Sequence, residues 1–242
     1  MLAIGNPEFA GAATLLDGPS RLIEAAGPTG QWPALPGSQT EMERAAAQFK
    51  HGATRILSGL EASEARLRAA SASGELSSAR HILLASHASF DPLRPQESRL
   101  ILRGSGAGAG PLEDGELSTG DLSGLRLNSQ LFVLSACNTA RGDAGDRSDN
   151  SGGNGGGNSG SNEGQFGCAY ALALAGNRNA LLTLWPVLDQ ASADFIARFF
   201  GHVASGQPHA LALQATKREF LQHPNPRWRA PRYWAGFVLF GT

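Results

Sequence analysis

The sequence predicts an α/β protein built around a mostly parallel, doubly wound sheet. Three apolar runs are typical of strands buried on both faces of such a sheet: HILLASH (81–87), QLFVLSA (130–136) and NALLTLW (179–185). Segments with helical spacing separate these runs, and strands that alternate with helices favour parallel pairing. A chain of 242 residues has the length of one large domain, so we predict a single domain over residues 1–242.

The N-terminal half contains further strands and two helices. Short apolar runs predict the strands: LAIGN (2–6), ATRILSG (53–59) and RLILRG (99–104). Ser38, followed by Glu41, matches the pattern of a capping box and predicts a helix from about residue 39 to 50. EASEARLRAAS (61–71) has the pattern of a second amphipathic helix.

The C-terminal half continues the alternation. FGCAYALALAG predicts an apolar helix that contains Cys168 and ends at Gly176, because glycine favours the turn out of a helix. We expect Cys168 to pack in the core. Two more helices and a last strand follow: DQASADFIARFFGHVASG (189–206), PHALALQATKREFLQ (208–222) and YWAGFVLFG (233–241).

One segment interrupts this pattern. A Gly/Asn/Ser-rich insert at about residues 143–164 has too little apolar surface to offset its ordering entropy, so we expect a flexible loop. Asp143, Asp146 and Asp149 are spaced by three, whereas the ligands of a calcium loop alternate at every second position. The insert therefore predicts a solvated linker, and the sequence predicts no metal site.

The overall composition narrows the classes of function. A formal net charge of −1 lacks the basic excess of nucleic-acid-binding proteins. Two cysteines are too few for a disulfide framework, and such a low cysteine content is typical of proteins in a reducing compartment. The N-terminus lacks the basic region of a signal peptide, and no apolar stretch approaches the ~20 residues of a transmembrane helix. We expect a cytoplasmic protein with no nucleic-acid or membrane partner, and the abundant Ala, Gly and Arg suggest a bacterial chain.

Two residues at predicted strand ends carry the chemistry. His87 ends one buried strand and Cys137 follows another, and sites in doubly wound sheets form at the carboxyl ends of strands. A thiolate is the nucleophilic form of cysteine, and a nearby histidine can take its proton and later protonate a leaving amine. His87 precedes Cys137 by 50 residues, the separation that caspases show. Ser135 could suggest a serine nucleophile instead, but it lies two residues before Cys137, on the same strand face and deeper in the sheet.

Five blocks in this order resemble the CHAT domain, a caspase-like protease family often fused to TPR repeats: LPGSQTEMERAA, LLASHASFD, LFVLSACNTARGD, ALALAGNRNALLTLWPVLDQASADF and RYWAGFVLFG. The resemblance covers nearly the whole chain and extends, at longer range, to separases, metacaspases and gingipains. It implies a caspase-like, mostly parallel sheet of about six strands flanked by helices. It also implies a Cys-His dyad, Cys137 and His87, that needs no cofactor.

The resemblance also implies other site residues. The backbone amides of Ala88 and Cys137 would form the oxyanion hole, although relatives usually have glycine where this chain has Ala88. Several relatives cut after a basic residue, and Asp189 corresponds to the acid that separase-like proteins use, with Trp185 as a wall of the same pocket. Alternatively, Asp189 caps the helix that follows it.

The implied activity leaves open how the protein is regulated and which alternative functions compete with it. Arg141 and Arg147 lie where caspases are processed, so the hypothesis of self-cleavage there stands beside that of an unprocessed loop. The expected partners are a protein substrate and a TPR region or activator protein. The alternative function is a catalytically inactive interaction module with the same fold, which the Ala88 departure favours. A different α/β hydrolase or phosphate-binding enzyme is disfavoured, because the sequence lacks the nucleotide and nucleophile-elbow motifs.

Overall fold

The computed structural model describes residues 1–9, 32, 34–89, 94–104, 114–138, 163–185 and 187–241. Within them the chain forms a sheet of eight strands: β1 (Leu2–Pro7), β2 (Arg55–Gly59), β3 (His81–Ser89), β4 (Arg99–Ile101), β5 (Glu116–Ser118), β6 (Leu131–Asn138), β7 (Asn179–Thr183) and β8 (Phe237–Gly241). The main order is β2-β1-β3-β6-β7-β8, and β4 and β5 extend from the end of β3. Pairing is parallel from β2 to β7 and antiparallel at β8, which confirms the predicted α/β class.

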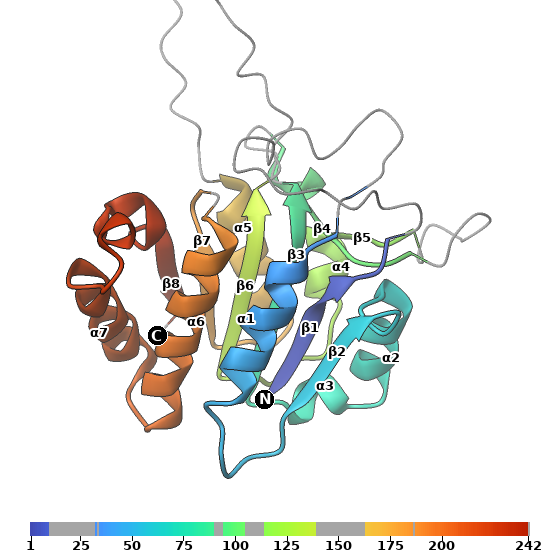
Figure 1. Cartoon of the computed structure of the whole chain (residues 1–242). Coiled ribbons are helices and arrows are strands. Elements are labelled where there is room, and N and C mark those ends of the chain that lie inside the picture. The colour runs from blue at the N-terminus through green and yellow to red at the C-terminus, as the bar shows by residue number, and fades with distance from the viewer. Residues whose placement is uncertain are drawn as a thin grey trace, which may run out of the picture.

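Helices cover both faces of this sheet (Figure 1). The described helices are α1 (Pro36–Ala46), α2 (Glu64–Ala72), α3 (Glu75–Ser78), α4 (Thr119–Ser123), α5 (Glu163–Leu174), α6 (Asp189–Ala204) and α7 (His209–Leu221). Short 3-10 turns are η1 (Pro95–Glu97), η2 (Pro226–Arg229) and η3 (Pro231–Tyr233). In Figure 1, α1 and α6 lie in front of the sheet and α5 lies behind it.

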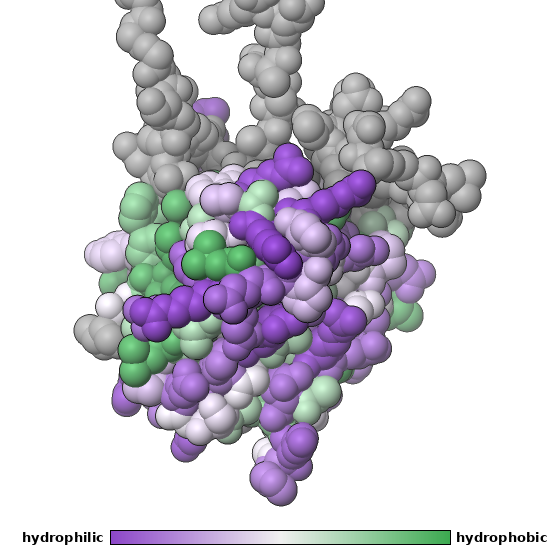
Figure 2. Space-filling model, turned by 60° about the vertical axis from the view of Figure 1, so that its left-hand side comes forward, coloured by the Kyte–Doolittle hydropathy of each residue, from purple (hydrophilic) through white to green (hydrophobic). Residues whose placement is uncertain are grey.

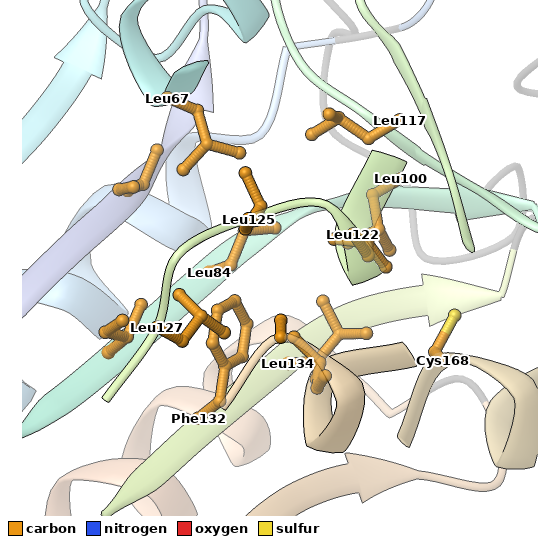
Figure 3. Close-up of a cluster of buried hydrophobic side chains, with 14 of the residues drawn as sticks. Leu67, Leu84, Leu100, Leu117, Leu122, Leu125, Leu127, Phe132, Leu134 and Cys168 are labelled. Atoms are coloured by element: carbon orange, nitrogen blue, oxygen red, sulfur yellow. The ribbon is translucent and has the colours of Figure 1, made fainter. Parts of the chain in front are cut away.

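The sheet separates two hydrophobic cores, because successive side chains of a buried strand point to opposite faces. Ile82 and Leu84 of β3 belong to the core shared with α2, α4 and α5, whereas Leu83 and Ala85 belong to the core under α1 and α6. Figure 3 shows the first of these cores, with Cys168 in the same cluster as Leu134. Each buried strand is therefore apolar on consecutive residues, as the sequence predicts for a doubly covered sheet.

The first helix differs from its prediction. It begins at Pro36 and ends at Ala46, whereas the sequence predicts residues 39 to 50. Leu35 is the N-cap, and the Ser38 hydroxyl donates a hydrogen bond back to the Leu35 carbonyl rather than capping the helix. The proline at the first helical position, whose fixed φ suits a helix start, explains the earlier beginning. The predicted capping box is therefore wrong, and Glu41 is left for another role.

The predicted insert lies mostly outside the described residues. Residues 139–162 are not described, and α5 begins at Glu163, inside the segment assigned to a flexible loop. The C-terminal limit of the insert is therefore earlier than residue 164. Single-domain organisation over residues 1–242 stays a prediction.

Gly176 is a site where a side chain should destabilise the fold. Its φ is 101°, and a Cβ there would lie 2.4 Å from the carbonyl oxygen of Leu127. Gly206 has a similar φ of 90° but no atom within 4 Å of a Cβ. We expect Gly206→Ala to lower the free energy of unfolding by about 1 kcal/mol, from backbone strain alone, and Gly176→Ala to lower it clearly more. Urea denaturation of both variants checks this, and equal losses would contradict the clash with Leu127.

The surface brought forward in Figure 2, the side of α6, α7 and β8, is mainly hydrophilic. Hydrophobic residues lie mainly along the left-hand side of this view, with a further small patch nearer its middle. None of the helices in the described part of the chain combines the length and the hydropathy that crossing a bilayer requires.

Candidate active site

The pairing of β3 with β6 brings the two predicted catalytic residues together. These strands are parallel neighbours, and their register places the Cα of His87 opposite the Cα of Cys137. Adjacent strands lie about 4.8 Å apart, so the two backbones approach closely at this edge of the sheet. The juxtaposition is long-range, since it joins residues separated by an α/β crossover, and it depends on the apolar runs that make both strands central.

His87 is enclosed by aromatic rings. Its side chain is 3% exposed and lies with ring centroids 5.6 Å from Phe9 and 5.0 Å from Trp32. These rings lie at 38° and 32° to the imidazole plane, so they restrict the rotation of the imidazole. Ala88, the residue after it, is fully buried and pairs with Leu100 of β4 as well as with Asn138 of β6. Its amide as an oxyanion donor stays a prediction.

A small polar cavity lies beside this edge of the sheet. It has a volume of about 30 Å³ and is lined by Leu35, Gly37, Ser38, Glu41, Ala85, Ser86, Ser135, Asp189 and Ser192. Ala85 and Ser135 are register partners, and they precede His87 and Cys137 by two residues in their strands. Side chains two apart share a strand face, so the cavity lies next to His87 on the α1–α6 side of the sheet.

Glu41 is the most deeply buried charged residue of this cavity. Its side chain is 4% exposed, and its Oε2 accepts a hydrogen bond of 2.9 Å from the Ser192 hydroxyl. The Ser192 hydroxyl also lies 3.2 Å from that of Ser135. Burial raises the pKa of Glu41 to about 7, against the lowering effect of the two serines, and the nearby Asp189 carboxylate raises it further. Near neutral pH this carboxyl group is therefore close to its titration midpoint.

Asp189 faces Glu41 from the start of α6. Leu188 is the N-cap of α6, and no side chain makes a capping hydrogen bond there, which contradicts the capping alternative for Asp189. Its carboxylate lies against α1: a Cβ on Gly37 would be 2.7 Å from Asp189 Oδ2. Burial raises the pKa of Asp189 above its usual value. The close approach of α1 and α6 at Gly37 thus places two carboxyl groups at one cavity.

The other predicted residues lie elsewhere. Trp185 is outside the lining of this cavity: its indole packs on Gly236 and donates a hydrogen bond of 2.9 Å to the Arg232 carbonyl. Cys168 is fully buried in the α5 core, and burial raises the pKa of its thiol to about 12, so it is unreactive, as expected for a packing residue. Arg141 and Arg147 lie outside the described residues. Over the described ranges, no three His, Cys, Asp or Glu residues gather as a metal site would require.

Sequence reasoning missed Glu41 as a site residue, because the Ser38-Glu41 spacing suggested a cap. The available signal was the position of Glu41 in the helical repeat. Glu41, Met42 and Ala45 lie on the same side of α1, and this side is buried. A lone glutamate on the apolar face of a short helix is unusual, since unpaired charges are seldom fully buried. Its partners, Ser135 and Ser192, come from distant segments and give no local pattern.

The pKa of Glu41 makes a prediction for stability. The folded-state pKa of about 7 exceeds the ordinary glutamate value of 4.5, so the native state binds the extra proton between these pH values. Stability is then full below pH 4.5 and falls as the pH rises through 7, by on the order of 3 kcal/mol. We expect Glu41→Gln, which mimics the neutral acid, to remove most of this fall. Urea midpoints at pH 5 and pH 8 check it, with Glu43→Gln on the same helix as the control; a wild-type fall that persists in Glu41→Gln contradicts it.

Comparison with known proteins shows the family of the chain. A family model described as "CHAT domain" matches residues 1–242, the whole chain. The chain belongs to the CHAT domain family. Among curated proteins, the chain is similar to Tetratricopeptide repeat protein 28 of Mus musculus, with 27% identity over 132 residues. The match covers 54% of this chain and 5% of that relative, so the chain spans a small part of the relative's length.

Proposed function

We propose that this CHAT domain is a caspase-like cysteine endopeptidase, with Cys137 as nucleophile and His87 as general acid and base. The observation that supports it best is the register of β3 and β6, which sets these residues opposite each other at one strand edge. Nucleophile and base must lie within hydrogen-bond reach for this chemistry. The proposed reaction uses no cofactor, and a reducing, cytoplasmic compartment would keep the thiol active.

The reaction has two steps. In the first, His87 takes the thiol proton, Cys137 sulfur bonds to the scissile carbonyl carbon, and the amides of Ala88 and Cys137 bind the oxyanion. The C–N bond breaks as His87 returns the proton to the leaving amine, which leaves a thioester. In the second, His87 takes a proton from water, whose oxygen attacks the thioester carbon. The C–S bond then breaks, the acid product leaves, and the thiol is restored.

Cleavage after a basic residue is the proposed specificity. Asp189 supports it, because it brings a carboxyl group to the cavity beside His87, and a carboxylate pairs strongly with a cationic side chain. Trp185 stays a proposed wall of the substrate pocket, although it lies outside the lining of this cavity. A peptide-library cleavage profile tests the whole proposal: we expect a basic residue before the cut, and an Asp189→Asn variant that loses this preference. Cleavage restricted to acidic or apolar residues would refute the role of Asp189.

The second candidate function is a catalytically inactive interaction module. Ala88 in place of the usual glycine favours it, because the fully buried alanine leaves less backbone freedom beside the proposed oxyanion. A thiol-reactive peptide probe discriminates the two functions. Labelling of the wild type but not of Cys137→Ala supports the peptidase, and labelling of neither supports the module.

Regulation and partners complete the proposal. The similarity to a protein named for its tetratricopeptide repeats suggests that a repeat region or activator protein associates with this domain. Self-cleavage at Arg141 or Arg147 would be one form of control. Incubation of the purified chain beside Cys137→Ala tests this, and a stable single band for both proteins would rule it out.

A further inference from the structure

We propose that Glu41 is the acidic end of a pocket for a single ammonium group, so that the domain takes a lysine side chain in preference to arginine. This inference rests on the proposed function, because the pocket is then the one that receives the residue before the cut. Glu41 comes from α1 and Asp189 from α6, and both line the cavity next to His87. The cavity's position beside the proposed dyad makes it a substrate pocket rather than an isolated void.

The Glu41 carboxyl group has an unused hydrogen-bonding atom. Ser192 donates to its Oε2, whereas its Oε1 is buried and accepts no hydrogen bond from any residue that the structure describes. A buried acceptor without a donor destabilises a fold, so such atoms tend to mark a ligand position. When Glu41 is ionised, a donor that enters the cavity would supply the missing partner.

The lining selects a cationic donor. Glu41 and Asp189 are the only titratable side chains that line the cavity within the described residues, and no Lys, Arg or His side chain lines it. The remaining polar residues of the lining are four serines: Ser38, Ser86, Ser135 and Ser192. The hydroxyl of Ser86 donates to the Ile101 carbonyl, and the hydroxyls of Ser135 and Ser192, which lie close to Glu41, can accept hydrogen bonds. Two carboxyl groups with hydroxyl acceptors complement a group that only donates, as ammonium and guanidinium do.

The size of the cavity selects ammonium over guanidinium. Its volume of about 30 Å³ matches the space of roughly one water molecule, and an ammonium group has similar dimensions. A guanidinium is a wider planar fork that needs bidentate space. Space is limited where α1 meets Asp189, because even a Cβ on Gly37 would lie 2.7 Å from Asp189 Oδ2. The ammonium group of a lysine thus fits the cavity with less rearrangement than the guanidinium of an arginine.

Binding of a cation should release a proton from Glu41. Below its pKa of about 7 this carboxyl group is mostly neutral in the empty pocket, and a bound ammonium favours the ionised form. Asp189, the other titratable group that faces it, disfavours a second negative charge until the cation arrives. Lysine binding therefore displaces about one proton per ligand at pH 6 and almost none at pH 8.

The test measures ligand binding without turnover. Nα-acetyl-lysine amide and Nα-acetyl-arginine amide are titrated by calorimetry into the 242-residue Cys137→Ala chain, at pH 6 and pH 8, in two buffers of different ionisation enthalpy. We expect the lysine ligand to bind at least about 10-fold tighter and to release a proton only at pH 6. Adding Glu41→Gln should weaken it at least about 30-fold at pH 8 and abolish the release. Adding Glu43→Gln, an exposed control, should change neither.

Other outcomes overturn the inference. Tighter binding of the arginine ligand, equal binding to Glu41→Gln, or no binding of either ligand would each refute the ammonium pocket. Because Glu41→Gln keeps the neutral form's shape, a matching melting temperature at pH 5 confirms that lost binding is not lost folding. Failure of the proposed function looks different: the ligand binds normally, but the chain with Cys137 intact cleaves no lysine peptide. If the inference holds, Arg141 and Arg147 are slow cleavage sites compared with a lysine.

Discussion

Replacement of Cys137 or His87 by alanine should lower peptide cleavage by on the order of 10⁴-fold or more. Cys137 supplies the nucleophile that attacks the peptide, and His87 carries out the proton transfers of both steps. Because the two residues act as one unit, the double variant should lose little more than either single variant. Initial rates on the best peptide of the library profile, for the wild type and the three variants, measure this.

Cys168→Ala is the matched control for the nucleophile. It removes the other cysteine of the chain, which is fully buried in the α5 core, and should leave the rate on the same peptide within a few-fold of wild type. A rate that survives in Cys137→Ala but falls in Cys168→Ala would overturn the assignment. Loss of rate in His87→Ala with unchanged labelling by an iodoacetamide probe would indicate that His87 acts in acid catalysis rather than in thiol activation.

Phe195→Ala should cause the largest loss of stability among single core substitutions on α6. The Phe195 ring is fully buried, stacks on Phe237 of β8 with centroids 3.9 Å apart, and meets Phe220 of α7 edge-on at 5.2 Å. Truncation removes the ring contacts with β8 and α7 and leaves a cavity, so we expect a loss of about 3–5 kcal/mol in the free energy of unfolding. Chemical denaturation monitored by circular dichroism measures it.

Leu211→Ala is the control for this loss. Leu211 lies on α7 and is 54% exposed, so its truncation should change stability by less than about 0.5 kcal/mol. A loss at Phe195 no larger than that at Leu211 would contradict the packing described for α6. Since α6 also carries Asp189 and Ser192, partial recovery of activity by Phe195→Leu would show that the core supports the pocket.

The strands and helices with strong local patterns could be predicted from the sequence. HILLASH and QLFVLSA become β3 and β6 because both faces of each strand are covered, which favours the consecutive apolar residues Ile82–Ala85 and Leu131–Leu134. The run RLILRG (99–104) predicts β4, although the strand ends earlier, at Ile101. The three-residue β5 and the five-residue α4 have no counterpart among the predicted elements, since such short elements depend on tertiary contacts. The true capping box is at Ser118 and Asp121 of α4, where both reciprocal hydrogen bonds form, and not at Ser38.

The candidate site divides in the same way. His87 and Cys137 could be predicted, because strand ends and residue chemistry are visible in the sequence. Glu41 could not, because its role arises only when α1 meets α6 and β6, and Asp189 needed the structure to separate a pocket residue from a cap. Residues whose function depends on contacts between distant segments leave no periodic signal to read.

β3 has different neighbouring strands along its length, and these pairings fix its register in the sheet. β1 pairs with its first half, from Ile82 to Ala85, while β4 pairs with its end, from His87 to Ser89. β6 pairs along the other side throughout. A slip of one residue against β6 would break both other pairings and turn His87 to the opposite face of the sheet. The β4–β5 hairpin, with no chemistry of its own, therefore protects the alignment of His87 with Cys137.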